Sequence, residues 1–123
     1  MLETANEYMS RSQQLWQEAQ IALQEGSRIQ ASEKLWGAAA QAVKAVGEAK
    51  GWPHNAHREL YNIIDRLERE TGQRRLGELF AIANALHQNF YEWWMPLEQV
   101  RERAAAIQEL REALAALMEP PSS

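Results

Sequence analysis

Apolar side chains recur every three or four residues along most of the chain, a spacing typical of amphipathic helices. Glycine or proline interrupts this pattern at "EGSR" (25–28), "GWP" (51–53), "TGQ" (71–73) and Pro96. Alternating runs of Val, Ile and Thr are absent, as are the Asn-Gly and Asp-Gly pairs of tight hairpins. The pattern therefore predicts five helices: about 2–24, 28–50 with Ser27 as its cap, His54 or Asn55 to the "TGQ" break, 74–95 and 97–117.

Short loops between five helices favour an all-α fold, an antiparallel up-and-down bundle of four to five helices. The 123 residues suffice for one domain with a real core and are too few for two. We expect a single bundle domain over residues 1–118, followed by a flexible tail, "EPPSS", at 119–123.

The predicted helix over residues 28–50 is apolar around most of its circumference. Its charged and amide side chains fill only about a third of the helical circle. Such a helix is expected at the centre of the bundle, with neighbours on two sides. Gly37 and the alanines around it would let another backbone approach closely, in the core or at a dimer face. Ser32 is expected to bond back to the carbonyl one turn earlier.

Composition and charge exclude several classes of function. The net charge of −4 provides no basic field for nucleic acid or an anionic membrane. The absence of cysteine excludes disulfides, thiol catalysis and cysteine metal sites. No signal peptide or membrane-spanning run is visible, so we expect a cytoplasmic protein.

The stretch "NALHQNFYEWW" (84–94) holds the first candidate for chemistry, His87. In projection His87 falls inside the apolar arc of its helix, with Asn84 and Tyr91 one turn to either side. A buried imidazole without a partner costs about 1–3 kcal/mol, so Glu33 and Lys44 on the central helix are candidate partners. The favoured interpretation is a satisfied core or interface histidine, and the alternative is a site facing a nucleotide or RNA.

His54 and His57, in "HNAH", are three residues apart, a spacing that metal ligands can use. Two nitrogens do not make a metal site, and a third ligand would have to come from elsewhere, such as Glu33 or Glu92. Projection puts His57 on the buried face of its helix. The pair is therefore predicted to be structural or capping, and no metal or other cofactor is expected.

Four arginines surround the "TGQ" break, with glutamates interleaved among them, which predicts an ion-paired surface rather than a phosphate site: Arg66, Arg69, Arg74 and Arg75. The sequence contains no glycine-rich phosphate loop, no Ser-His-Asp arrangement and no zinc motif such as HExxH. It also lacks the paired ExxH motifs of a di-iron bundle.

Three ordered segments, "EGSRIQASEKLWGAAAQAVKAVGEAKGW", "HNAH" and "ALHQNFYE", carry a family resemblance. Over about residues 26–92 the chain resembles the archaeal paralogous-repeat (PaREP-type) proteins, relatives of the HEPN superfamily of small helical bundles. It departs from that pattern at Trp36, where relatives usually have Tyr, and around Gly37, where they carry more charge.

The resemblance implies a four- to five-helix up-and-down bundle that is commonly a homodimer. HEPN relatives are often paired with a small nucleotidyltransferase, and some are toxin ribonucleases. The ribonucleases have an Arg four to six intervening residues before a His. The matching positions before His87 are Phe80, Ala81 and Ile82, and Lys50 before His57 is separated by a helix break. The motif is absent, so the resemblance does not carry the ribonuclease activity to this chain.

The first hypothesis is a non-catalytic, homodimeric module that binds a nucleotide, RNA or a protein partner. Its cleft would be lined by the polar set Glu33, Lys44, Asn84, His87 and Tyr91. One alternative is an atypical metal-independent ribonuclease with His87 or His57 as general base. Another is a helical adaptor with no small-molecule site.

Overall fold

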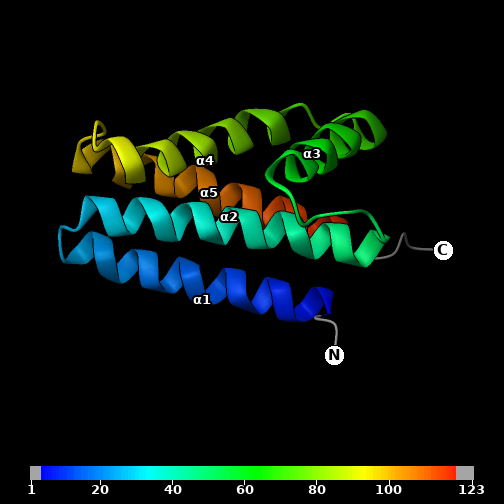
Figure 1. The fold of residues 1–123 in the computed structure, drawn as a ribbon, viewed down its shortest axis with the longest axis horizontal. Helices are drawn as coiled ribbons and strands as arrows, with labels where there is room; N and C mark the ends of the chain where they lie inside the picture. The colour runs from blue at the N-terminus through cyan, green and yellow to red at the C-terminus, as the bar shows by residue number, and fades with distance from the viewer. Residues whose placement is uncertain (1–3, 119–123) are drawn as a thin grey trace.

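The computed structural model describes residues 4–118, which form five α-helices and no strand (Figure 1). The helices are α1 (Ala5–Gln24), α2 (Arg28–Lys50), α3 (His57–Thr71), α4 (Arg75–Glu92) and α5 (Leu97–Met118). Helices α1 and α2 form one antiparallel pair, α4 and α5 form another, and the shorter α3 packs on one side (Figure 1). The predicted all-α bundle is confirmed, whereas the predicted tail at 119–123 lies outside the described residues.

Capping explains where three predicted helix ends were wrong. Helix α1 begins at Ala5 because Thr4 and Glu7 form a reciprocal capping box. Helix α3 begins at His57, since the Glu59 carboxylate accepts the backbone N–H groups of both Asn55 and Ala56. Helix α4 ends at Glu92, three residues before the predicted end, because the next residue is left-handed.

Helix α2 begins at Arg28 and ends at Lys50, as predicted, but one detail of its start differs. Ser27 occupies the cap position, yet its side chain makes no capping hydrogen bond. At the other end Gly51 adopts a left-handed conformation (φ 74°), which glycine allows at little cost.

The central position predicted for α2 is confirmed, since it packs against all four other helices. The close approach at Gly37 is made by α1: a Cβ at this glycine would lie 3.1 Å from the Cδ1 of Leu15. One turn away, the hydroxyl of Ser12 donates a 2.6 Å hydrogen bond to the backbone carbonyl of Ala38. Gly37 and Ala38 therefore serve the contact between α1 and α2 within one chain.

Helix α3 covers only part of the face that α2 and α4 share. Its C-terminal part lies on the start of α4, where Glu68 accepts the N–H of Gly77. Its middle packs on the end of α2, where Ile63 faces Gly47. Its first residue, His57, reaches Asn84 on α4. The first turns of α2 and the last turns of α4 therefore extend beyond the N-terminus of α3, which does not cover them. The candidate site lies where α3 begins.

None of the helices within residues 4–118 combines the length and the apolar character that crossing a membrane requires.

Candidate functional site

The indole of Trp36, on α2, is a platform for two histidines from two other helices. The imidazole of His57 stacks on it with ring centroids 5.2 Å apart and planes inclined by 26°. The imidazole of His87 stacks on it at 4.7 Å and 27°. The two imidazoles lie 5.9 Å from each other, also nearly parallel. Three helices thus meet in one cluster of flat rings.

Two tyrosines extend this cluster into a continuous ridge. Tyr61 lies 5.4 Å from His57, and Tyr91 meets His87 edge-on at 5.3 Å. The side chain of Tyr61 is 46% exposed and that of Tyr91 is 69% exposed. We call this set the aromatic ridge: Tyr61, His57, Trp36, His87 and Tyr91. Its ends are open to solvent, while its centre is anchored on α2.

Asn84 fixes the orientation and the tautomer of His57. The amide nitrogen of Asn84 donates to the carbonyl of Phe80 (2.9 Å), which turns the amide oxygen toward the imidazole. That oxygen lies 3.1 Å from Nε2 of His57. Because an amide oxygen only accepts, Nε2 of His57 carries a proton and donates.

His87 is held by ring contacts rather than by hydrogen bonds to its inner nitrogen. Its Nδ1 is buried and has no hydrogen-bond partner within residues 4–118. Burial lowers the pKa of His87 below its ordinary value, the nearby charge of His57 lowers it further, and Glu33 opposes the shift. The imidazole is therefore neutral at neutral pH. A partner for Nδ1 is missing within residues 4–118, and a partner across an interface stays a prediction.

A hollow of about 480 Å³ opens beside the ridge, between α1, α2 and the start of α3. Trp36 and His57 belong to both the ridge and the hollow. The other polar residues that line it are Glu33, Lys34, Gln41, Lys44 and Asn55. Its apolar floor comes from Leu15, Gly37, Ala40 and Leu60.

The two lysines of the hollow have different partners. The ammonium of Lys34 is paired with the carboxylate of Glu18 at 2.8 Å. The ammonium of Lys44 donates to the backbone carbonyl of His54 at 2.8 Å, a neutral partner that leaves its charge in place. Lys44 is therefore the side chain of the hollow best suited to attract an anion.

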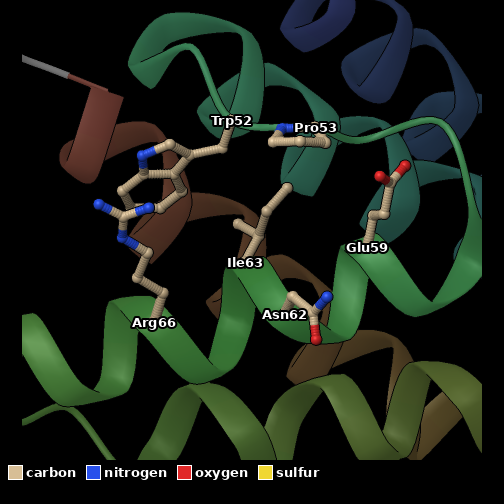
Figure 2. A pocket seen from close by; sticks show the side chains of 6 residues that line it. All are labelled: Trp52, Pro53, Glu59, Asn62, Ile63 and Arg66. Carbon is tan, nitrogen blue, oxygen red and sulfur yellow. The ribbon is translucent and has the colours of Figure 1, made fainter.

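A second, smaller pocket of about 120 Å³ lies between α3 and the segment that holds Trp52 and Pro53 (Figure 2). The guanidinium of Arg66 covers the indole of Trp52, 4.1 Å from its centroid, and Ile63 lies between Trp52 and Glu59 (Figure 2). Since Arg66 already occupies the aromatic face and Glu59 caps α3, this pocket is less suited to a ligand than the hollow at Lys44.

The sequence pattern that defines the archaeal PaREP1/PaREP8 family matches residues 7–111. The chain belongs to this family. It is also similar in fold to a crystal structure of a protein from Sulfolobus solfataricus, with a TM-score of 0.78 and 19% sequence identity. That alignment covers 97% of this chain and 100% of the other. No curated protein matches the chain. The PaREP resemblance is confirmed, and kinship with the HEPN superfamily stays a prediction.

The fold brings the predicted site residues of this PaREP1/PaREP8 chain to one region, in two groups. Asn84, His87 and Tyr91 lie on α4 along the ridge. Glu33 and Lys44 lie in the hollow on α2. Lys44 was one candidate partner of His87, and it bonds the His54 carbonyl instead.

Two members of the site were missing from the predicted polar set. Trp36 was singled out only as a departure from the family pattern, and its role as the platform depends on where α3 begins. His57 was expected on a buried face, but it is exposed and lies over Trp36. Two features of the sequence point to these residues. Trp36 departs from the family pattern, and His57 lies in the histidine-rich turn.

His54 and three of the four loop arginines make structural contacts, as predicted. His54 is buried, with Nε2 2.8 Å from the carboxylate of Glu48. No group of three or more metal-ligating side chains exists within residues 4–118. Three of the four loop arginines form ion pairs, and Arg74 is exposed: Arg66–Glu70, Arg69–Asp65, and Arg75 with Glu109 and Glu78.

Proposed function

We propose that this PaREP1/PaREP8 chain is a non-catalytic helical module that binds a nucleotide. Its base would stack at the aromatic ridge, and its phosphate would enter the hollow beside it. One observation carries the proposal: Trp36 and His57 form part of both the stack and the hollow that contains Lys44. A base bound at the ridge and a phosphate bound in the hollow would therefore be close enough to belong to one ligand.

The ridge has the properties of a base-stacking platform. Stacking of a base on an aromatic side chain is worth about 1–3 kcal/mol and tolerates any base. The neutral imidazole of His87 adds a flat surface with no charge to desolvate. Amide groups near the rings, such as Asn55 and Gln41 of the hollow, can bond the edge of a base.

The charge distribution favours a mononucleotide over a long nucleic acid. Within the hollow, Glu18 compensates Lys34, whereas Lys44 bonds a neutral carbonyl; the carboxylate of Glu33 also lines the hollow, so the attraction for an anion depends on Lys44 alone. The chain as a whole has a net charge of −4, which repels an extended phosphate backbone. Binding would therefore depend on one local phosphate contact.

The test is calorimetric titration with adenosine monophosphate and with adenosine. We expect the monophosphate to bind more tightly, since a hydrogen bond to a charged partner contributes about 1.5–3 kcal/mol. Lys44→Met should lower its affinity about tenfold or more, to the level of adenosine. Lys50→Met is the matched control, because Lys50 lies on the same helix outside the hollow. His57→Ala should weaken both ligands.

Absence of binding by wild type would overturn the proposal, as would equal binding to wild type and Lys44→Met. Unmeasurable binding of purine and pyrimidine monophosphates alike would favour the adaptor hypothesis, in which the ridge contacts protein only.

The two adjacent imidazoles give the ribonuclease alternative a specific basis. Centroids 5.9 Å apart suit a general acid and a general base acting on one phosphodiester. The Asn84 bond that commits Nε2 of His57 and the buried Nδ1 of His87 count against it. RNA cleavage in the presence of a chelator, lost in His87→Ala, would support this alternative over binding alone.

The homodimer and a nucleotidyltransferase partner, both implied by the resemblance, remain part of the proposal. Light scattering tests the first: a dimer mass at tens of micromolar chain supports it, and the mass of one chain refutes it.

A further inference from the structure

The turn between α4 and α5 exposes aromatic side chains away from the hollow. Within residues 4–118 five large apolar side chains are exposed, and three of them fall in the four positions 91–94. Trp93 is 63% exposed and Trp94 is 47% exposed, next to Tyr91. The turn lies at one end of the bundle, the same end as the turn between α1 and α2 (Figure 1). An aromatic cluster of this kind on a surface marks an interaction site.

The backbone of Trp93 adopts an unfavourable conformation in this turn. With φ 56° and ψ 39° it is left-handed, and it is the only residue other than glycine with positive φ within residues 4–118. A bulky residue is rare in this region because its Cβ crowds the backbone. Helix ends that need this conformation usually have glycine or asparagine. A tryptophan at this position therefore indicates that its indole has a function.

A series of buried hydrogen bonds holds the turn in place. The side chain of Asn89 is fully buried; its oxygen accepts the N–H of Met95 at 2.6 Å, and its nitrogen donates to the hydroxyl of Ser32 at 2.8 Å. Ser32 in turn donates to the carbonyl of Arg28, as predicted. The N–H of Trp93 donates to the carbonyl of Asn89.

The consequence is a rigid turn with its indoles outside. Met95 is completely buried and anchors the turn from within. Tryptophans on a backbone held in this way lose less conformational entropy on binding than they would on a mobile loop. They are also the side chains most often found as binding hot spots.

The charges around the turn indicate what kind of partner fits. Glu92 and Glu98 flank it and are exposed, and Glu25 lies in the adjacent turn. Two arginines at this end turn toward carbonyls: Arg28 donates to Met95 and Arg101 to Leu23. Both arginines keep their charge, since a carbonyl is a neutral partner, and Arg101 also pairs with Glu98, so the three carboxylates exceed the two guanidiniums by one negative charge.

We propose that the Trp93–Trp94 turn is a docking surface for a basic protein partner, one that offers an apolar helix face bordered by Lys or Arg. The indoles would pack on the apolar face, and Glu92, Glu98 and Glu25 would face the basic border. A second copy of this chain fits less well, because a symmetric contact would bring the same carboxylates together. An anionic membrane would repel them as well.

The test uses two short amphipathic helical peptides, one of leucine and lysine and one of leucine and glutamate, titrated against the full chain. We expect the lysine peptide to bind, to shift tryptophan emission to shorter wavelength and to weaken as salt rises. Trp93→Gly removes the indole and suits the left-handed backbone, so it should fold. It should weaken binding at least about tenfold. Ile21→Ala, which removes another exposed apolar side chain, should not.

Equal binding of the two peptides, or binding that Trp93→Gly leaves unchanged, would overturn the proposal. A dimer that dissociates in Trp93→Gly would assign the turn to a second copy, and binding to anionic vesicles that this variant abolishes would assign it to a membrane. The nucleotide titration with Trp93→Gly is independent of these outcomes, since the turn does not line the hollow.

Discussion

His57 and His87 belong to different helices, yet their imidazoles lie 5.9 Å apart on one indole. Two imidazoles this close resist carrying charge together, and His57 is a direct cause of the lowered pKa of His87. Burial of His87 acts in the same direction and is the larger cause. The pair is therefore best accommodated when His87 is neutral, which has a consequence for stability.

Acidification should destabilise the chain through His87. Its pKa is lower in the folded state than the unfolded value of 6.5, so the unfolded chain binds more protons between the two values. Stability then rises with pH in that window: it is complete above about pH 6.5 and falls as pH drops below it. Thermal melts at about pH 7.5 and 5.5 should show a larger loss for wild type than for His87→Phe, which keeps the stack without titrating.

His57→Phe is the control for the electrostatic part of this effect. It removes the neighbouring charge but not the burial of His87, so the acid-induced loss should shrink without vanishing. An identical loss in wild type and His87→Phe would show that other groups set the pH dependence.

The helical architecture was predictable because it depends on local signals. The apolar spacing and the glycine and proline breaks gave five helices, and the bounds of α2 were right at both ends. The site was predictable only in part. Asn84, His87 and Tyr91 share one face of α4, which projection shows. The stack of His57 on Trp36 depends on how α3 meets α2, and no pattern within one helix contains that relation.

Replacing Ser12 should cost more stability than replacing the larger, charged Arg111. The hydroxyl of Ser12 donates to the Ala38 carbonyl and accepts a 2.8 Å hydrogen bond from Nε of buried Arg111. Ser12→Ala leaves that guanidinium nitrogen without its partner and should cost about 1–3 kcal/mol. Arg111→Met removes the buried charge and keeps the Ala38 bond, so we expect a loss below about 1 kcal/mol.

Denaturant unfolding of both variants measures the difference. The free energy of unfolding of the double variant should be close to that of Arg111→Met, because no guanidinium is then left without a hydroxyl partner at position 12. A larger loss for Arg111→Met than for Ser12→Ala would contradict this account and show that packing of the arginine stem dominates.

Trp93→Gly should leave stability unchanged or raise it. Glycine relieves a left-handed conformation that costs an ordinary residue about 1–2 kcal/mol, while its greater freedom in the unfolded chain costs about 0.5–1 kcal/mol. The lost indole is mostly exposed, so little burial is forfeited. Thermal melts test this, with Trp93→Ala as the matched variant that removes the indole and keeps the strain. If Trp93→Gly melts below Trp93→Ala, the backbone argument is wrong.

The turn at Trp93 also shows where sequence reasoning fails. Pro96 suggested that α4 would continue to Met95, because proline breaks a helix at its own position. The helix ends earlier since Asn89, two turns back from Pro96, captures the N–H of Met95. An asparagine within an apolar helix gives no sign of which backbone group its amide will bond.

Gly47→Ala should destabilise the junction between α2 and α3 despite the better helix propensity of alanine. The added Cβ would lie 2.8 Å from Cδ1 of Ile63 and 3.1 Å from Cβ of His54, in a buried contact. Overpacking of this kind costs about 1–3 kcal/mol, against a propensity gain of about 1 kcal/mol. The difference is a net loss of up to about 2 kcal/mol, which denaturant unfolding measures.

Ile63→Val decides whether that contact is the cause, because valine lacks the methyl that the new Cβ would strike. Alone, it should cost about 0.5–1.5 kcal/mol for the lost burial. In the Gly47→Ala background it should cost less or restore stability, so the double variant should be more stable than the sum of the single losses. Additive losses would place the strain at His54 instead, whose Cβ belongs to the turn and cannot move without shifting the carbonyl that Lys44 holds.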